Sequence, residues 1–154
     1  MARLRHIALA VEDPEKAAEF YIKAFGMSRV GETDWINAKG VYLSDGVINL
    51  ALLKYKTEEA AGARGTGYTG LHHFGFWVDD VPQTKKAIED AGGSYWMGEV
   101  SKTGGFYEVK YHDPNGLVVD ITADGWVGAC KDVAPAEAGE RIESAFSVPG
   151  DSTQ

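Results

Sequence analysis

Apolar and polar residues alternate along two stretches of similar sequence, residues 4–13 and residues 71–80. In the second stretch, LHHFGFWVDD, the alternation is typical of a β-strand that carries His73 and Trp77 on one face and mostly apolar residues on the other. The first stretch, LRHIALAVED, has His6 at the matching place, 67 positions before His73. The pattern therefore predicts two related strands, each with a histidine on its more polar face.

The repeat extends beyond these strands. Residues that recur at the same offset of 67 include Leu4, Val11, Asp13, Gly26, Gly31 and Glu32. Two units, 3–54 and 71–122, are each too small to bury a sheet face alone, so we expect them to pack as one domain over residues 1–124. Residues 55–70 then form a linker, and residues 125–154 form a polar C-terminal tail.

The hydrophobic periodicity predicts the order β-α-β-β-β in each unit. In the first unit we expect a helix that begins at Asp13-Pro14 and ends before Gly26, and strands at 3–11, 27–33, 35–44 and 47–54. In the second we expect a helix at 82–91 and strands at 71–79, 94–99, 106–112 and 117–122. The linker is rich in Gly, Ala and Thr and is expected to hold no strand, and a short helix is expected near 136–145. The fold class is therefore α+β, with two tandem βαβββ modules.

Composition narrows the class of function. A formal net charge of −8 argues against nucleic-acid binding, for which a basic patch would be expected. Cys130 is the sole cysteine, which excludes an intrachain disulfide and a cysteine-based zinc site. No apolar run is long enough for a membrane span, and the first residues do not resemble a secretory signal. We therefore expect a cytoplasmic protein with a small-molecule substrate or ligand.

The chain resembles the vicinal oxygen chelate superfamily, which includes glyoxalases, bleomycin-resistance proteins and extradiol dioxygenases. The residues that carry the resemblance are His6 with Val11, Asp13 and Pro14, His73 with Val78 and Asp80, and the stretch DPNGLVVD at 113–120. It covers roughly residues 3–122 and implies a curved mixed sheet around a cleft that holds a divalent metal ion. Family members usually form dimers, and an unpaired edge strand in each half also favours a homodimer.

Three residues are candidates for metal ligands. Strand parity places Asp120 on the same face as His6 and His73, because Leu117, Val119 and Ile121 occupy the opposite, helix-packed face. Two histidines and a carboxylate match the ligand set of metal sites with open positions, so we expect one divalent transition metal, either Fe, Mn, Ni or Zn. The family usually has Glu where this chain has Asp120, which is one methylene shorter.

The first module of family members often supplies a further ligand, usually Glu or Gln. Strand parity places Asn49 at the position that matches Asp120, although counting from the turn glycines would select Leu50 instead. Parity is the better guide, because turning Leu50 inward would also turn Ile48 and Leu52 out of the core. Since an amide is a weak metal ligand, Asn49 is expected to orient substrate or a water molecule.

Other residues are assigned from the same parity. Glu108 is the candidate catalytic base, set against the simpler interpretation of a solvated strand charge. Lys110 shares its face and is a candidate substrate-binding residue, and Trp77 is a candidate wall of the cleft. His72 is interpreted as structural or solvent-facing, and neither His112 nor Cys130 is given a role.

Three functions remain open. The favoured one is a metal-dependent lyase or isomerase of the glyoxalase-like or epimerase-like type, acting on a small oxygenated substrate through an enediolate-type intermediate. An alternative is a metal-free protein that sequesters a ligand in an aromatic cleft, with which Trp35, Trp77 and Trp96 are compatible. The third is an extradiol dioxygenase, which is disfavoured because Lys110 stands where the dioxygenase signature has a tyrosine.

Overall fold

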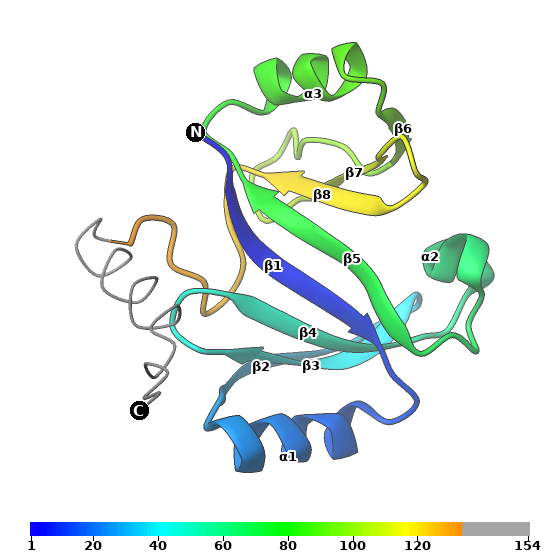
Figure 1. The fold of residues 1–154 in the computed structure, drawn as a ribbon, viewed down its shortest axis with the longest axis vertical. Helices are drawn as coiled ribbons and strands as arrows, with labels where there is room; N and C mark the ends of the chain where they lie inside the picture. The colour runs from blue at the N-terminus through cyan, green and yellow to red at the C-terminus, as the bar shows by residue number, and fades with distance from the viewer. Residues whose placement is uncertain (134–154) are drawn as a thin grey trace, which may run out of the picture.

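The computed structural model describes residues 1–133 of the chain. Eight strands form one mixed sheet in the order β2-β3-β4-β1-β5-β8-β7-β6 (Figure 1). The strands are β1 (Arg3–Ala10), β2 (Ser28–Asp34), β3 (Ala38–Ser44), β4 (Asn49–Tyr55), β5 (Gly70–Trp77), β6 (Ser94–Met97), β7 (Val109–His112) and β8 (Val118–Thr122). The helices are α1 (Pro14–Phe25), α2 (Glu58–Ala61) and α3 (Val81–Asp90), with a 3-10 turn η1 (Gly62–Arg64).

The sheet has the internal symmetry that the repeat predicts. Strands β1 and β5 pair antiparallel at its centre, and each pairs in parallel with the last strand of its own module, β4 or β8. Helices α1 and α3 lie at opposite ends of the molecule on the outer side of the sheet (Figure 1). The α+β fold of two βαβββ modules is thus confirmed. The sheet face turned away from α1 and α3 is called the inner face below.

Both long helices begin as their sequences predict. The Asp13 side chain accepts hydrogen bonds from the backbone N–H groups of Glu15 and Lys16, and Asp80 accepts one from Gln83. These carboxylates satisfy backbone donors that have no partner within the helix. Gly26 ends α1 in the left-handed conformation, with φ of 68°, which a glycine adopts without strain.

Three clusters of buried apolar side chains pack on the two faces of the sheet. One packs α1 on the outer face and contains Ala18, Val41, Leu43, Leu50 and Leu52. A second joins α3 to the other half-sheet through Val78, Val81, Val109, Tyr111 and Ile121. The third lies on the inner face of the first module and contains Ala8, Ala10, Ala38, Ala51, Leu53, Tyr55 and Ala61. Small alanines on the central strands leave room on the inner face for larger polar side chains.

Several element boundaries differ from the predicted ones. Strand β4 begins at Asn49, two residues later than predicted, because the Asp45 side chain accepts hydrogen bonds from the backbone of Val47 and Ile48. Strand β7 begins at Val109, three residues later than predicted at 106. Local side-chain bonds to the backbone of this kind are hard to predict from periodicity.

Apart from its end residues, Tyr55 of β4 and Gly70 of β5, the linker at 55–70 holds no strand, but it contains α2 and η1, which were not predicted from the sequence. Thr57 caps α2 by accepting a hydrogen bond from the Ala60 backbone. A four-residue helix is too short to show a hydrophobic period, so this signal was missed. The helix predicted near 136–145 lies outside the described residues. Within residues 1–133, no helix is long and apolar enough to cross a membrane.

Residues 123–133, called the return segment below, fold back after β8 onto earlier strands. The Cys130 N–H donates to the Val47 carbonyl, and the Arg5 side chain donates to the carbonyl of Cys130. The Ser44 hydroxyl donates to the Gly128 carbonyl. These bonds fix the segment across the sheet, although its sequence resembled the start of a polar tail.

Candidate metal centre

The two central strands bring His6 and His73 together on the inner face. His6 pairs with Gly75, and His73 pairs with Ala8, so each imidazole has a small residue as its cross-strand neighbour. The Nε2 atoms of the two histidines lie 3.1 Å apart. Both side chains are buried, at 3% and 4% exposure. The repeat therefore produces a pair of buried imidazoles that face one point.

Asp120 on β8 completes this cluster. It pairs with Gly75, which has no side chain to separate it from the histidines. Its Oδ2 lies 3.2 Å from His73 Nε2, and one ligand atom of each of the three residues lies within 4.8 Å of the others. Asp120 is fully buried, and its Oδ1 has no hydrogen-bond partner among the described residues.

Asn49 determines which nitrogen of His6 carries the proton. Its Nδ2 donates to the Val127 carbonyl over 2.8 Å, so its Oδ1 is left to accept. The Nδ1 of His6 lies 2.8 Å from this Oδ1 and is therefore the protonated nitrogen. The Nε2 of neutral His6 then carries a lone pair that points toward His73.

The strand register corrects the predicted counterpart of Asp120. His6 pairs with Asn49, and His73 pairs with Val118, so Asn49 corresponds to Val118. Two residues further on, Ala51 is the counterpart of Asp120. Parity correctly places Asn49 on the inner face, but it could not distinguish two positions on the same face. The first module thus offers one candidate ligand, His6, where the second offers two, His73 and Asp120.

Lys110 on β7 and Glu108, which directly precedes this strand, add charge beside Asp120. The Lys110 ammonium contacts Asp120 Oδ2 directly and lies 3.3 Å from Glu108 Oε2. Burial acts to lower the pKa of Lys110, but the two carboxylates outweigh it and raise the pKa above its usual value. Lys110 therefore stays positively charged.

The two carboxylates respond differently to this ammonium. For Asp120, burial outweighs Lys110 and raises the pKa to about 7. For Glu108, burial acts to raise the pKa, but Lys110, His6 and the Trp126 hydrogen bond together lower it. Glu108 is therefore ionised at neutral pH, while Asp120 carries a charge that its surroundings stabilise poorly.

Burial also keeps both imidazoles neutral. It lowers the pKa of His6 to about 4, although Glu108 and Asn49 act in the opposite direction. It lowers the pKa of His73 well below its usual value, and Lys110 and His6 lower it further. Neutral imidazole is the form that binds metal ions.

Trp126 in the return segment covers this cluster and was not among the predicted site residues. Its indole stacks on the His6 ring with centroids 4.8 Å apart, and its Nε1–H donates to Glu108 Oε1 over 2.6 Å. A Cβ on Gly75 would lie 2.7 Å from two atoms of the indole. A tryptophan is unusual on an exposed surface, so its presence in a predicted polar tail could have indicated that this part of the chain packs on the domain.

The remaining predicted residues lie as follows. Trp77 donates its indole N–H to the Ala123 carbonyl, and its ring is covered by Gly125 and the Lys131 ammonium. It contacts the return segment, away from the histidine pair. His72 is half-buried and contacts His73 directly, with 2.8 Å between their Nδ1 atoms.

The residues present fit a divalent metal ion. Metal bonds of about 2.1 Å at right angles would place neighbouring ligand atoms roughly 3.0 Å apart. The separations are 3.1 Å between the imidazoles and 3.2 Å between His73 and Asp120, and the ligand atoms of His6 and Asp120 lie within 4.8 Å of each other. The partnerless Oδ1 of Asp120 adds a free acceptor in a buried place, where an unsatisfied oxygen is costly. The donor set of imidazole and carboxylate suits transition metals better than Ca or Mg.

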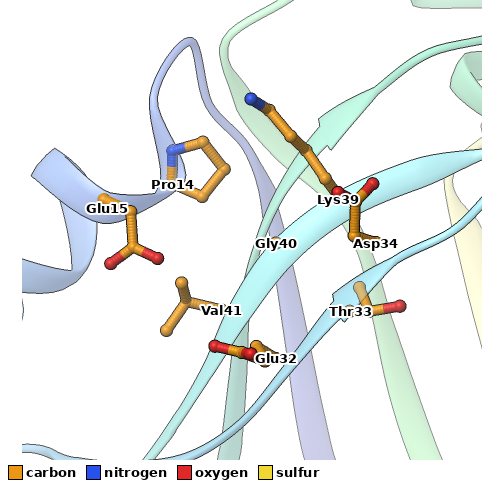
Figure 2. Close-up of a pocket in the computed structure, with 8 residues that line it drawn as sticks. All are labelled: Pro14, Glu15, Glu32, Thr33, Asp34, Lys39, Gly40 and Val41. Carbon is orange, nitrogen blue, oxygen red and sulfur yellow. The ribbon is translucent and has the colours of Figure 1, made fainter.

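A groove on another part of the molecule carries more exposed charge. Pro14 and Glu15 of α1 line it together with residues of β2 and β3, among them Glu32 and Asp34 (Figure 2). Arg29 binds both Glu15 and Glu32, and Lys56 binds Asp34. Its carboxylates are therefore already paired with basic side chains, unlike Asp120 Oδ1.

Comparison with known proteins places this architecture in a family. Residues 3–121 match the family model described as the Glyoxalase/Bleomycin resistance protein/Dioxygenase superfamily. No curated protein matches the chain. A solved hypothetical protein from Bacillus halodurans is similar, with a TM-score of 0.65, 19% identity, and coverage of 86% of this chain and 97% of its own.

Methylmalonyl-CoA epimerases are also among the similar structures. The Streptomyces coelicolor enzyme, solved with 2-nitronate-propionyl-CoA, has a TM-score of 0.64 and 22% identity, and covers 77% of this chain and 92% of its own. The Mycobacterium tuberculosis enzyme has a TM-score of 0.59 and 20% identity, with coverage of 88% and 91%. At these identities the likeness shows the fold. The fold and the family-model match together show that this chain belongs to the glyoxalase/bleomycin resistance protein/dioxygenase superfamily, the vicinal oxygen chelate superfamily.

Proposed function

We propose that this protein is a metal-dependent isomerase or lyase, epimerase-like or glyoxalase-like, that moves a proton beside a carbonyl group of a small oxygenated substrate. The observation that carries the proposal is the convergence of His6 Nε2, His73 Nε2 and Asp120 Oδ2 at separations of 3.1 and 3.2 Å. Lys110 supplies positive charge to Asp120 Oδ2, but the two imidazole Nε2 atoms have no such partner, and acceptor atoms that meet inside a protein without a cation repel one another. Their arrangement is therefore best explained as a cation site.

His6, His73 and Asp120 would hold the ion, and Asn49 would keep His6 in the correct tautomer. A bound Fe, Mn, Ni or Zn ion supplies positive charge that stabilises an enediolate-type oxygen and makes the neighbouring C–H more acidic. Because Ala51 stands opposite Asp120 in the module symmetry, the protein supplies three ligands, and positions remain for substrate oxygens.

Glu108 is the proposed proton acceptor. Its carboxylate is ionised and held in place by Trp126 at Oε1 and by Lys110 at Oε2. Its side chain is 23% exposed, so a substrate can reach it, whereas Asp120 is fully buried. Lys110 would hold the position of Glu108 and stabilise negative charge on the substrate. Trp126 would exclude water from one side of the cluster.

Hydrogen exchange tests this assignment. The metal-loaded protein is incubated in D₂O with methylmalonyl-CoA, the substrate type of the similar epimerases, and with a panel of α-hydroxycarbonyl compounds. We expect deuterium to enter at the carbon beside the carbonyl. Glu108→Gln should abolish exchange while metal uptake persists, and Glu99→Gln, at an exposed carboxylate, should leave both unchanged. Exchange at an undiminished rate in Glu108→Gln would remove Glu108 from the mechanism.

A metal-free binding protein is the second candidate. The specific observation in its favour is the Lys110 ammonium, which already supplies a cation to Asp120 and Glu108. In that case the stacked Trp126 and the imidazoles would form a site for a planar ligand. Metal titration of the apo protein separates the two candidates.

We also propose that the protein is a cytoplasmic homodimer. Strands β2 and β6 lie at the two edges of the sheet and expose unpaired backbone groups, which a second copy could cover. Sedimentation at micromolar concentration should give about twice the chain mass of 16.6 kDa. A mass near that of one chain would refute the dimer.

A further inference from the structure

The histidine beside the proposed ligand His73 has contacts that its predicted structural or solvent-facing role did not anticipate. The Nδ1 of His72 lies 2.8 Å from the Nδ1 of His73. Its Nε2 lies 3.0 Å from the Ala61 carbonyl, and the Tyr55 hydroxyl lies 3.1 Å from its Nδ1. The His72 ring also stacks on Tyr55, with centroids 4.2 Å apart. Both ring nitrogens of His72 are therefore engaged.

These contacts determine where the protons lie. A carbonyl oxygen only accepts hydrogen bonds, so His72 Nε2 must be the nitrogen that donates to Ala61. Above about pH 7.5 imidazole is neutral, and a neutral ring has a single N–H. The Nδ1 of His72 is therefore an acceptor with one lone pair. The Nδ1 of His73, at 2.8 Å, is closer to it than the Tyr55 hydroxyl, at 3.1 Å, so we assign His73 Nδ1 as the donor. The Nε2 of His73 is then left with a lone pair that points toward His6 and Asp120.

We infer that His72 is a positioning residue that holds the proton of His73 on Nδ1, through a chain of contacts that runs from the Ala61 carbonyl to His73. Asn49 does the same for His6 from the other module. The short helix α2 in the linker supplies Ala61, which gives this segment a place in the site. The effect on metal affinity rests on the proposed function, whereas the tautomer of His73 is a property of the metal-free chain.

Nitrogen-15 NMR of the imidazoles in the full-length, metal-free protein tests the inference at about pH 8, where histidine is neutral. We expect His73 to be protonated on Nδ1, the opposite of the tautomer that free neutral histidine prefers. In His72→Phe, a planar ring can still stack on Tyr55, but the acceptor is lost and the proton of His73 should move to Nε2. Zinc affinity should then fall about 10- to 100-fold, as for other residues that orient metal ligands.

The matched control is His112→Phe. His112 also lies in the second module and packs on an aromatic ring, Trp96, at 5.1 Å, but no hydrogen bond or ring contact within residues 1–133 joins its side chain to the cluster. This variant should leave both the tautomer of His73 and the zinc affinity unchanged. Wild-type His73 protonated on Nε2, or an unchanged tautomer in His72→Phe, would overturn the inference. If the variant fails to fold, the tautomer seen in the wild-type spectrum decides the question by itself. The predicted tautomer in a protein that binds no zinc would uphold this inference and refute the metal proposal.

Discussion

The indole ring of Trp126 lies parallel to the imidazole of His6, with 4° between the ring planes and 4.8 Å between their centroids. These residues come from the return segment and from the first strand of the sheet. The same indole donates to Glu108, so one side chain contacts both a proposed ligand and the proposed base. The return segment is thus part of the candidate site.

Trp126→Ala should lower the free energy of unfolding by about 3 kcal/mol, the usual cost of removing a large buried aromatic side chain. Trp126 is 8% exposed, whereas Trp35 is 58% exposed and makes a matched control. Urea denaturation of both variants measures the difference. Equal losses in Trp126→Ala and Trp35→Ala would show that the indole is not packed as described.

Gly75→Ala should also destabilise the protein, by about 1–3 kcal/mol, because the added methyl group overpacks the site. Its Cβ would lie 2.7 Å from the Trp126 ring and 3.1 Å from His6 Cβ. Gly67→Ala is the control, since a Cβ there would meet nothing within 4 Å. In the Trp126→Ala background, the cost of Gly75→Ala should shrink, because the clashing ring is gone. Equal costs in the two backgrounds would contradict this contact.

Lys110→Met should destabilise the metal-free protein by about 3 kcal/mol, because it leaves the buried Asp120 without its cation. A divalent ion should restore part of this loss, since it replaces the missing charge. Lys86→Met removes an exposed ion pair with Asp90 and should cost less than about 1 kcal/mol. Thermal unfolding with and without zinc measures these effects. An equal, small cost for both variants would show that Lys110 does not neutralise Asp120.

The buried His6 should make stability depend on pH. Its folded pKa of about 4 lies below the unfolded value of 6.5, so the unfolded chain binds more protons between these values. The contribution of His6 to the free energy of unfolding is fully present above pH 6.5. It is lost as the pH falls toward 4, and the loss is about 3 kcal/mol at most. Asp120 acts in the opposite direction, because its raised pKa of about 7 makes the folded state take up a proton.

The comparison of two variants separates these contributions. Between pH 6.5 and 4, His6→Gln should lose less stability than wild type on acidification, and Asp120→Asn should lose more. Urea denaturation of the metal-free proteins across this range measures the slopes. Identical slopes in all three proteins would show that neither group titrates as described.

Strand periodicity was sufficient to predict the repeat and the face on which His6, His73 and Asp120 lie. A period of two fixes a face but not the position along it, which is why Asn49 was matched to Asp120 when the register selects Ala51. The contacts of Trp126 depend on how the chain returns after β8. That path depends on partners far away in the sequence, such as Ser44, Asn49 and Val47, and periodicity does not reveal these contacts.

The ion pairs of Lys110 with Glu108 and Asp120 could not be predicted from the sequence either. Glu108 and Lys110 lie two positions apart on one face, as parity predicted. Their meeting with Asp120 depends on the pairing of Lys110 with Asp120 between β7 and β8. His72 contacts both the Ala61 carbonyl and His73. This could not be predicted, because Ala61 lies in a helix that is too short to show a hydrophobic period. Tertiary hydrogen bonds of this kind become visible only in the folded chain.

Titration calorimetry of the metal-free protein with Zn²⁺, Mn²⁺, Ni²⁺ and anaerobic Fe²⁺ tests the central claim most directly. We expect one ion to bind per chain, with binding lost in His73→Ala and retained in His112→Ala, and with the fold of both variants intact by circular dichroism. His73 faces the cluster and lies outside the three apolar clusters, so its removal should spare the core. Wild-type protein that takes up none of these ions would contradict the metal site and would favour the metal-free binding protein.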